Sequence, residues 1–549
     1  MTCARRSRPI ASGSTGGGSG VARSPAGRAL VFIGFMGAGK STAAAAARGA
    51  GLEVVDTDAR LERELGCSIA EFFDRHGEPE FRRREEALAG ELLERADGGA
   101  IALGGGSVLS ERVRAALERH VVVWLRVGAE DAWGRVDDSR PLARDRPGFE
   151  SLLAEREPIY EELADAVLPA ADLGTVERAM PALLGLRELA AGTRMAWAAS
   201  ASGEYPAYVG RGLLETSPLD GAARYGGLGA GGRAFCVTDA TVGELYAKRL
   251  EPLAGRIEVS PGEGAKTLAE AERVLRELAR LGATRSDHVL ALGGGVVGDL
   301  AGFCAATYQR GIGVVQVPTT LVAQVDSAYG GKTGVDLPEA KNYVGAYHLP
   351  RAVLADPATL ATLPAGELAA GFVEVLKTAL IRGGALWERA RTIEAPLDPT
   401  ELDDLIFACV LTKLEVVAAD ERDSGARAAL NLGHTVGHAI EAASGYARYR
   451  HGEAIGLGLL AALRLSGAGE LREEVGSILG RHELPVALDP GIAVDEVLAP
   501  LERDKKRTAA GVGFVLCERP GEVVTARTLD AGRVRAAVEE LRRPADGAR

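Results

Sequence analysis

The sequence predicts an α/β protein with more than one domain, and three observations lead to this fold class. The chain has 549 residues, which is too long for one ordinary core and suggests roughly three to four domains. Two glycine-rich turns, near residues 34 and 293, each follow a buried-strand pattern and precede a helical pattern. From about residue 357 the pattern becomes mainly helical.

Composition narrows the class of protein. Charged residues make up 26% and hydrophobic residues 46% of the chain, as is typical of a soluble globular enzyme. The net charge of −12 disfavours a general nucleic-acid-binding role. The 6 cysteines are scattered without a CxxC pair, which indicates neither a disulfide framework nor a zinc finger. We therefore expect a cytoplasmic protein, and no run of 18 apolar residues predicts a membrane span.

Residues 1–28 predict a disordered tail. They are rich in Ser, Gly, Ala and Arg, contain no acidic residue and cannot build a core. An organellar transit peptide has a similar composition, but the segment shows no clear amphipathic helix. An ordinary flexible tail is the favoured interpretation.

The first glycine-rich turn has the pattern of a phosphate-binding loop. A buried strand at 29–33 leads into Gly34-Phe-Met-Gly-Ala-Gly39-Lys40-Ser41 and then into an alanine-rich helix, so a G-x4-G-K-S motif lies between strand and helix. Backbone N–H groups and the helix N-terminus attract phosphate, Lys40 reaches the β- and γ-phosphates, and Ser41 binds Mg²⁺. A chance glycine turn is the alternative, and the agreement of motif and context disfavours it.

Further polar residues follow in the same region. Asp56 and Asp58 come at the end of a second strand, and the basic run at 81–85 is expected before a helix. A strand ends in the turn at 104–106, and arginines stand at 140 and 156. Each feature is weak alone, because exposed arginines are usually solvated. Together, and in this order, they make residues 29–186 resemble shikimate kinase.

This resemblance implies a P-loop, nucleoside-monophosphate-kinase-like α/β/α domain that transfers the γ-phosphate of ATP to the 3-hydroxyl of shikimate. Such chemistry depends on positioning and on neutralising charge, and planar guanidinium groups suit a carboxylate substrate. The resemblance implies Mg²⁺ bound by Ser41 with Asp56 beside it, and catalytic roles for Lys40, Asp58 and Arg140. The implied ATP-binding residues are Gly37, Ala38, Gly39, Lys40, Ser41, Thr42 and Arg140, and the implied shikimate-binding residues are Asp58, Arg82, Gly105 and Arg156.

Residues 187–204 are small and lean towards polar, which predicts a linker in which Trp197 can dock on a neighbouring element. A second α/β pattern starts near residue 205. Its strand at 288–292 runs into a triple-glycine turn that can lay backbone amides against a pyrophosphate. The turn is not GxGxxG, so its specificity is modest. Polar residues at the ends of strands and turns in this region are Asp239, Glu263, Lys266, Asp299, Thr319 and Thr320.

A pair of histidines marks the helical region. The stretch Asn431-Leu-Gly-His434-Thr-Val-Gly-His438 places two imidazoles four residues apart, so on a helix they share a face and can bind a divalent cation. The alternative is a helix whose histidines cap or pack. Charged and polar residues around this stretch are Arg310, Asp326, Lys332, Lys341, Asn342, Glu374, Lys377, Lys413, Arg427, His451 and Lys505.

From about residue 205 to residue 540 these features resemble 3-dehydroquinate synthase. The resemblance implies a Rossmann-like NAD-binding α/β domain at 205–356, packed on an α-helical metal-binding domain at 357–549 with the active site in the cleft. It implies that Glu374, His434 and His451 bind Zn²⁺ or Co²⁺. His438 is then assigned to the substrate phosphate and to proton transfer, not to the metal.

The same resemblance implies the reaction and its residues. NAD⁺ transiently oxidises 3-deoxy-D-arabino-heptulosonate 7-phosphate, phosphate is eliminated, and an aldol step closes the carbocycle. The implied NAD-binding residues are Asp239, Glu263, Gly264, Ala265, Lys266, Gly294, Gly295, Val296, Val297, Gly298, Asp299, Thr319, Thr320, Lys332 and Lys341. The implied substrate-binding residues are Arg310, Asp326, Lys332, Asn342, Lys377, Lys413, Arg427, Asn431, His438 and Lys505, with catalytic roles for Lys332, Lys377, Lys413 and His438.

Two alternatives stay open at this point. Another sugar phosphate cyclase or a polyol dehydrogenase would share the NAD fold and the metal triad, although Lys413, Arg427, Asn431 and His438 favour the dehydroquinate synthase. One half could instead be a catalytically silent scaffold, against which the intact phosphate-binding loop and metal triad argue. We expect small-molecule substrates and a homodimer formed through the synthase half, without nucleic acid or membrane partners.

Overall fold

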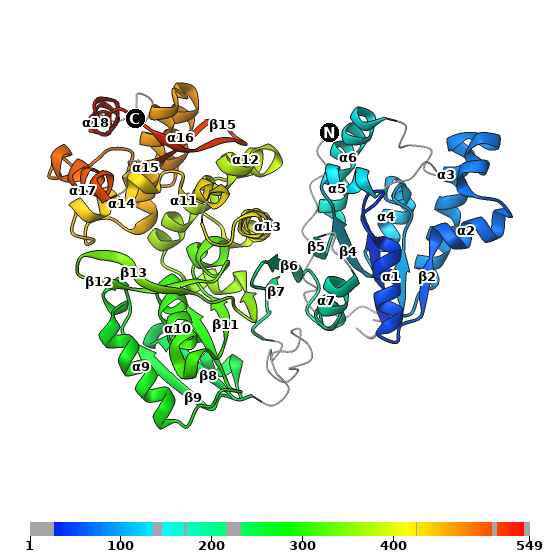
Figure 1. The fold of residues 1–549 in the computed structure, drawn as a ribbon, viewed down its shortest axis with the longest axis horizontal. Coiled ribbons are helices and arrows are strands. Elements are labelled where there is room, and N and C mark those ends of the chain that lie inside the picture. The colour runs from blue at the N-terminus through cyan, green and yellow to red at the C-terminus, as the bar shows by residue number, and fades with distance from the viewer. Residues whose placement is uncertain are drawn as a thin grey trace, which may run out of the picture. The chain divides into compact units, whose positions relative to one another are not determined.

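The computed structural model describes residues 27–135, 145–169, 173–215, 232–423, 425–507 and 513–542 (Figure 1). The chain forms two compact units, Met1–Trp197 with Asp220–Ala230, and Ala198–Leu219 with Gly231–Arg549. The predicted disordered tail falls almost entirely on residues outside the described part. Among the described residues, no helix is long and apolar enough to span a membrane.

The first unit is built on a parallel sheet. Its strand order is β2-β3-β1-β4-β5-β6, with every described pair parallel. The strands are β1 (Leu30–Ile33), β2 (Val54–Asp56), β3 (Ala100–Ala102), β4 (Val121–Arg126), β5 (Ala166–Pro169) and β6 (Arg194–Ser200). The helices are α1 (Lys40–Gly49), α2 (Thr57–Leu65), α3 (Ile69–Arg95), η2 (Ser107–Leu109), α4 (Glu111–Leu117), α5 (Ala129–Gly134), α6 (Arg146–Leu163) and α7 (Leu173–Leu186). The strand β1 is buried along its whole length, as expected for a parallel strand covered on both faces.

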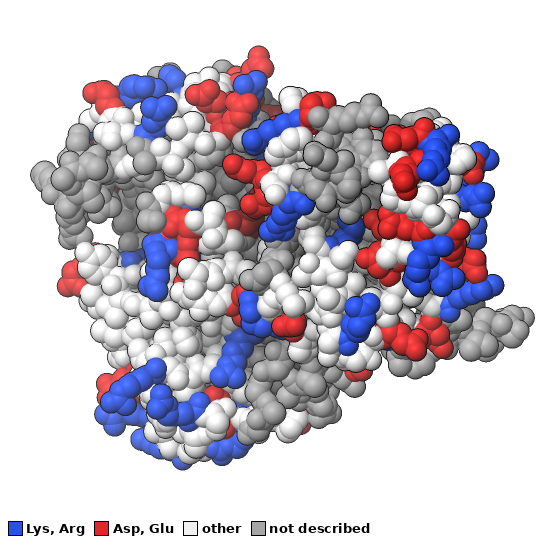
Figure 2. All heavy atoms as spheres, turned by 45° about the vertical axis from the view of Figure 1, so that its right-hand side comes forward, with Lys and Arg blue, Asp and Glu red and all other residues white. Residues whose placement is uncertain are grey.

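Two local predictions for this unit differ from the structure. The basic run at 81–85, expected before a helix, lies inside α3. The helix is interrupted earlier, at Gly77, whose φ of 75° only glycine adopts readily, and it resumes with Pro79. Acidic and basic side chains are intermixed on the face of the molecule shown in Figure 2. The ion pairs Arg60–Glu64 and Arg84–Glu80 lie along α2 and α3.

The predicted linker at 187–204 is also different from expectation. Its second half forms β6, which pairs in parallel with β5. Met195, Ala196 and Trp197 are buried, so the tryptophan that was expected to dock belongs to a strand. The prediction of a linker rested on the many small residues in this stretch. Alanine can nevertheless lie in a buried strand when larger side chains pack around it, because strand preference depends on the packing context.

The second unit contains a parallel sheet with the order β7-β14-β11-β10-β8-β9. The strands are β7 (Gly203–Val209), β8 (Ala234–Asp239), β9 (Gly255–Val259), β10 (His288–Gly293), β11 (Gly313–Pro318) and β14 (Ala352–Ala355). The associated helices are α8 (Ala240–Tyr246), η3 (Ala247–Leu250), η4 (Glu263–Ala265), α9 (Leu268–Arg280), α10 (Gly295–Thr307), η5 (Tyr308–Arg310) and η6 (Ala323–Ser327). A hairpin of β12 (Lys332–Leu337) and β13 (Ala340–Tyr347) packs on α10.

The remainder of the second unit is mainly helical. Its elements are η7 (Pro357–Thr362), α11 (Ala365–Arg382), α12 (Gly384–Arg391), η8 (Pro399–Glu401), α13 (Asp403–Ala419), η9 (Ala426–Asn431), α14 (His434–Ala443), α15 (His451–Ser466), α16 (Gly469–Arg481), α17 (Val494–Arg507) and α18 (Ala531–Glu540). The helix α11 is buried nearly all round, as a central helix is, and it contacts α13 and α15.

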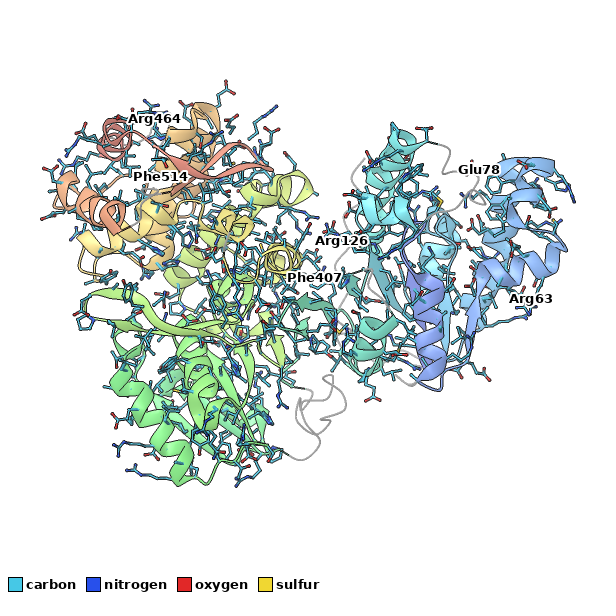
Figure 3. All side chains as sticks on the ribbon, viewed as in Figure 1. Arg63, Glu78, Arg126, Phe407, Arg464 and Phe514 are labelled. Atoms are coloured by element: carbon cyan, nitrogen blue, oxygen red, sulfur yellow. The ribbon has the colours of Figure 1, made fainter. Side chains whose placement is uncertain are left out.

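One element was not expected in this helical region. The strands β15 (Gly513–Arg519) and β16 (Glu522–Thr528) form an antiparallel hairpin with Gly521 at its turn. The hairpin packs on α15, and Figure 3 labels Phe514 of β15 and Arg464 of α15. The prediction of a helical region rested on the general pattern after residue 357. The burial of β15 does not alternate strictly, so no clear strand pattern marked the hairpin.

Candidate functional sites

The phosphate-binding loop of the first unit has the backbone that its glycines require. Gly39 has a φ of 89° and directly precedes α1. A Cβ at Gly34 would lie 2.7 Å from the carbonyl oxygen of Leu125, and one at Gly37 would lie 2.6 Å from that of Ala132. The Nζ of Lys40 donates hydrogen bonds to the carbonyl oxygens of Gly34 and Phe35, both at 2.9 Å. These hydrogen bonds hold the loop in a closed turn around the place where a phosphate would bind.

A pair of oxygen-bearing side chains stands beside the loop. The hydroxyl of Ser41 donates to Oδ2 of Asp56 at 3.0 Å. The other oxygen of Asp56 accepts hydrogen bonds from the backbone N–H groups of Asp58 and Ala59 and so caps α2. Hydroxyl and carboxylate oxygens are the ligands that Mg²⁺ prefers, so the residues present fit this ion.

The glycine turn at 104–106 joins this loop to a cluster of acidic and basic side chains. A Cβ at Gly105 would lie 3.4 Å from the carbonyl oxygen of Gly34 and 3.8 Å from Nζ of Lys40. A Cβ at Gly104 would lie 2.8 Å from Oδ1 of Asp58, and one at Gly106 would lie 2.0 Å from Nη1 of Arg82. The turn therefore brings Asp58 and Arg82 to the phosphate loop, and a side chain on it would displace them.

Three partners of these predicted residues were not identified from the sequence. Glu85 is buried, lies 2.5 Å from Nη1 of Arg82 and accepts a hydrogen bond from the hydroxyl of Ser107. Burial raises the pKa of Glu85, and Arg82 offsets this only in part. The Tyr160 hydroxyl donates to the carbonyl oxygen of Gly105 at 2.6 Å. Glu85 lies one helical turn after Arg82, and that spacing was the available signal.

The remaining predicted residues of this site are Arg156 and Arg140. Arg156 is buried on α6, with its guanidinium 5.9 Å from the centre of the Phe35 ring in the phosphate loop. Arg140 lies outside the described residues.

The second unit contains a cavity of about 1090 Å³. The lining residues come from the parallel sheet, from the β12–β13 hairpin and from α11, α13, α14 and α15. Most of the predicted residues line it: Asp239, Glu263, Lys266, Gly294, Gly295, Val296, Val297, Asp299, Thr320, Asp326, Lys332, Lys341, Asn342, Lys377, Lys413, Arg427, Asn431, His434, His438 and His451.

Several predicted residues do not line this cavity. Gly264, Ala265, Gly298, Thr319 and the buried Glu374 are absent from its wall, and so is Arg310. Arg310 follows the end of α10, whereas the glycine turn precedes the start of that helix. A helix of 13 residues is about 20 Å long, which explains the separation. The side chain of Lys505 lies outside the described part.

The backbone of the triple-glycine turn forms part of the cavity wall, at Gly294 and Gly295. The helix α10 begins directly after β10, and its cap, Gly294, offers no capping side chain. A Cβ at Gly294 would lie 3.0 Å from Cγ2 of Thr320, so a larger residue would crowd the turn. Nearby, Lys266 pairs with Asp299 at 2.5 Å and also donates to Asn342. A helix N-terminus with free amides suits a pyrophosphate.

Buried charges run through the middle of the cavity. Lys377 is 1% exposed and lies 2.5 Å from both Asp326 and Glu374, and Asp326 also pairs with Lys413. Burial alone lowers the pKa of Lys377, but the two carboxylates raise it above its ordinary value. Lys377 is therefore a buried cation that holds two acids in place.

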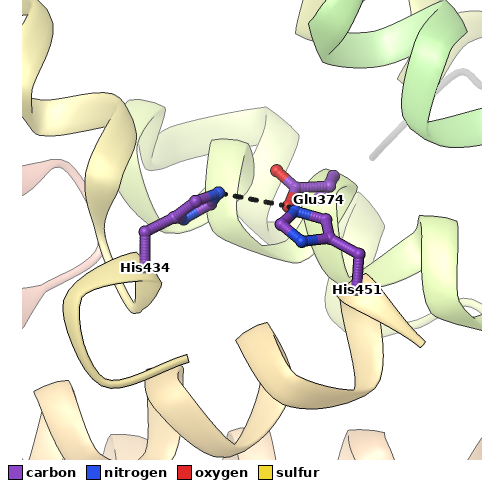
Figure 4. Close-up of side chains that lie close together, drawn as sticks. All are labelled: Glu374, His434 and His451. Atoms are coloured by element: carbon purple, nitrogen blue, oxygen red, sulfur yellow. Dashed lines mark ion pairs between the residues drawn. The ribbon is translucent and has the colours of Figure 1, made fainter. Parts of the chain in front are cut away.

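Glu374, His434 and His451 meet beside these charges (Figure 4). Oε1 of Glu374 lies 3.6 Å from Nε2 of His434 and 3.4 Å from Nε2 of His451. Oε2 of the buried Glu374 lies 2.5 Å from Nζ of Lys377, and burial lowers the pKa of His434 to about 3, with Lys377 adding to the effect. A carboxylate and two imidazoles form a typical ligand set for a catalytic zinc or cobalt ion, so these residue types fit the metal.

Glycine contacts bring the three helices of this cluster together. A Cβ at Gly452 of α15 would lie 1.8 Å from the carbonyl oxygen of Ala370 in α11. A Cβ at Gly458 would lie 2.0 Å from the carbonyl oxygen of Gly433, which precedes α14 with a φ of 79°. No side chain fits at these two positions, and the close approach places His434 and His451 against Glu374.

His434 and His438 share a helix, as their spacing predicts, but they have different neighbours. Their ring centres are 5.2 Å apart at the start of α14. Nε2 of His438 lies 3.9 Å from Glu441, not beside Glu374. The donor atoms of His438, Glu441 and His451 form a second group close enough to hold a cation.

Comparison with known proteins identifies the families to which the two parts of the chain are similar. The models for the N-terminal and C-terminal parts of 3-dehydroquinate synthase match residues 256–370 and 371–507. The synthase of Symbiobacterium thermophilum is 44% identical over 358 residues, which cover 62% of this chain and 98% of that protein. The synthase of Methylococcus capsulatus is 43% identical over 61% of this chain and 96% of that protein. The chain belongs to the 3-dehydroquinate synthase family. The model for shikimate kinase matches residues 36–180, so the chain is a fusion of two enzymes of the shikimate pathway.

Solved structures are similar to parts of this chain. A 2-deoxy-scyllo-inosose synthase, in complex with carbaglucose-6-phosphate, NAD⁺ and Co²⁺, is 25% identical with a TM-score of 0.56 and covers 63% of this chain and 99% of that one. The 2-epi-5-epi-valiolone synthase of Streptomyces hygroscopicus, with NAD⁺ and Zn²⁺, is 27% identical with a TM-score of 0.57 over 62% of this chain and 98% of that one. A shikimate kinase from Acinetobacter baumannii is 31% identical over 27% of this chain and 87% of that one, with a TM-score of 0.26.

Proposed function

We propose that the kinase part phosphorylates the 3-hydroxyl of shikimate with ATP. The carboxylate of Asp58 accepts hydrogen bonds from substrate hydroxyls, while Arg82 and Arg156 bind the substrate carboxylate. Lys40 leaves its two carbonyl partners and pairs with the β- and γ-phosphates. Ser41, with Asp56 beside it, would hold Mg²⁺, which would neutralise charge on the transferred phosphoryl group. Arg140 completes the ATP site.

We propose that the synthase part converts 3-deoxy-D-arabino-heptulosonate 7-phosphate to 3-dehydroquinate and phosphate. Once bound at Glu374, His434 and His451, the metal would supply a Lewis acid at the substrate hydroxyl, and NAD⁺ would supply a hydride acceptor. Asp326 binds a substrate hydroxyl, and Lys377 and Lys413 stabilise negative charge on the substrate oxygens. His438, which is exposed to the cavity, accepts or donates the proton that accompanies loss of phosphate.

One observation carries the synthase proposal. A single cavity is lined by the N-terminus of α10, by two histidines of the metal cluster and by several lysines. A dinucleotide, a metal and a substrate with both a carboxylate and a phosphate require these three kinds of surface side by side. The NAD⁺ and the metals found in the two related cyclases support the same cofactors here.

The decisive experiment supplies the purified protein with NAD⁺, Zn²⁺ or Co²⁺ and the heptulosonate phosphate. We expect release of inorganic phosphate together with dehydroquinate. Sedoheptulose 7-phosphate and glycerol serve as alternative substrates, for another sugar phosphate cyclase and for a polyol dehydrogenase respectively. Turnover of either of these in place of the heptulosonate phosphate would refute the assignment.

The metal site has its own test. We expect His434→Ala to remove most of the bound metal and His438→Ala to leave it largely in place, because of these two histidines it is His434 that approaches Glu374, whereas His438 faces Glu441. Metal content after gel filtration, with and without a chelator, measures the difference. If both variants lost the same amount of metal, His434 and His438 would both be metal ligands, and the assignment would be wrong.

A further inference from the structure

Glu441 lines the cavity beside the metal cluster and was not singled out from the sequence. It lies on α14 and is 3% exposed. Its Oε1 is 3.4 Å from Nδ1 of His451 and 3.2 Å from Nζ of Lys341. Its Oε2 faces Nε2 of His438 at 3.9 Å and has no hydrogen-bond partner among the described residues. One carboxylate thus approaches two of the three histidines in the cavity.

The backbone holds this carboxylate in place. The carbonyl oxygen of Glu441 accepts hydrogen bonds from the backbone N–H of Tyr446 and from the hydroxyl of Ser444, both at 2.9 Å. Tyr446 also stacks against Lys341, whose Nζ lies 4.5 Å from the ring centre. The lysine that pairs with Glu441 is therefore itself positioned from the same end of α14.

The ring of His451 lies between two carboxylates. Its Nε2 faces Glu374 and its Nδ1 faces Glu441, each at 3.4 Å. A neutral imidazole carries one N–H and one lone pair. If Nδ1–H donates to Glu441, the lone pair remains on Nε2, beside Glu374 and His434. This is the tautomer that a metal bound by Glu374, His434 and His451 requires.

The same geometry argues against a second cation held by His438, Glu441 and His451. Such a cation would need the lone pair of Nδ1, while the first metal needs that of Nε2, and a neutral ring cannot supply both. The ammonium of Lys341 also lies beside Oε1 of Glu441 and would repel a cation there.

We propose that Glu441 is a positioning residue, which fixes the Nδ1–H tautomer and the ring orientation of His451 so that its Nε2 can bind the metal. This inference rests on the proposed metal site. It predicts that Glu441 controls metal affinity although it does not touch the metal.

Three variants of the full-length protein test the inference. Glu441→Leu removes the acceptor with little change in size, and Glu441→Gln keeps an acceptor oxygen but loses the charge. Asp356→Asn is the matched control, because Asp356 is a carboxylate 1% exposed in the same unit that caps η7 and does not line the cavity. For each protein we would measure Zn²⁺ affinity by competition with a chromophoric chelator, the visible absorption spectrum with Co²⁺, and Tm.

We expect Glu441→Leu to bind Zn²⁺ about 10- to 100-fold more weakly and to alter the Co²⁺ spectrum. Glu441→Gln should recover part of the affinity, which a purely structural role would not produce. Asp356→Asn should lower Tm and leave both metal readouts unchanged.

The opposite outcomes are distinguishable. Wild-type affinity in Glu441→Leu overturns the inference, and so does a loss that merely follows Tm in all three variants. Binding of two Zn²⁺ per wild-type chain, with one lost in Glu441→Leu, makes Glu441 a ligand and overturns it as well. A wild-type protein that binds no metal refutes the proposed metal site itself, which is a separate failure.

Discussion

The two catalytic parts of this chain build their sites from different materials. The kinase site consists largely of backbone: glycines at 34, 37, 39 and 104–106 let main-chain groups and Lys40 surround the phosphate space. The synthase cavity consists largely of buried charge, in which Lys377 connects Asp326 to Glu374. Removing a side chain from a site built of backbone should lower activity but leave the fold stable. Removing one partner from a site of buried charges should lower stability as well.

This contrast predicts the largest effect for Lys377→Met. The change leaves Asp326 and Glu374 without their shared buried cation, and breaking a buried ion pair from one side costs about 3–5 kcal/mol. Urea unfolding followed by a probe in the synthase part should show this loss. The exposed Lys248 provides the control, and Lys248→Met should change stability by less than about 0.5 kcal/mol. Similar stability of the two variants would contradict the view that buried charge supports the fold of this site.

The next effect concerns activity and not stability. Lys40→Ala removes a cation whose Nζ donates to the carbonyl oxygens of Gly34 and Phe35 in its own loop, and we expect the kinase part to remain folded. We expect the kcat for shikimate phosphorylation to fall by about 10²–10³-fold or more, the usual cost of one positioned donor. Formation of dehydroquinate should be unchanged, and His451→Ala should show the reverse pattern. If either variant, still folded, lost both activities, the two sites would not be independent.

A smaller effect is expected from replacing a glycine with alanine, and it depends on whether the new methyl group meets a side chain or the backbone. In Gly106→Ala the new methyl meets the flexible end of Arg82, which can move aside. We expect a modest fall in Tm, because Arg82 also pairs with the buried Glu85, and a rise of about tenfold in the KM for shikimate, because a displaced guanidinium binds a carboxylate less well. In Gly452→Ala the methyl meets the carbonyl oxygen of Ala370, which cannot move without shifting α11. This variant should lose about 1–3 kcal/mol of stability, as overpacked cores do. A Gly106→Ala enzyme with unchanged KM would show that the turn does not position Arg82.

The same contrast explains which parts of the molecule could be predicted from the sequence. The phosphate loop is contiguous, so its motif and its strand–loop–helix setting were legible from the residues alone. The spacing of His434 and His438 correctly predicted a shared helix. Glu374 stands far earlier in the chain, however, and only the family resemblance joined it to His434 and His451. Residues that a long-range fold brings together leave no local pattern.

The features that were missed have similar causes. Composition alone suggested a linker where β6 is buried, because a stretch of small residues does not reveal what packs on it. Glu441 follows His438 by three residues on the same helix, so the spacing was visible, but nothing local indicated that His451 would approach it. Arg310 belongs to the family pattern, yet its position after α10 keeps it out of the cavity wall of this chain.

The smallest predicted effect comes from an acid that lies outside both sites. Asp287 is 2% exposed, accepts hydrogen bonds from the backbone N–H groups of Arg233 and Thr284, and pairs with the half-exposed guanidinium of Arg233. Although burial raises the pKa of Asp287, these contacts hold it well below its ordinary value. A depressed carboxyl pKa stabilises the fold above the unfolded value of about 4, and this contribution is lost as the pH falls through the folded pKa. We expect Asp287→Asn to cost about 1 kcal/mol at pH 7, since the exposed arginine is screened, and to cost progressively less below about pH 4. Urea unfolding of both proteins from pH 7 to pH 3 measures this difference. If the difference in unfolding free energy between the two proteins stays constant over that range, Asp287 acts through packing and not through its charge. Charge would then stabilise this unit only where ions are buried together, as in the cavity.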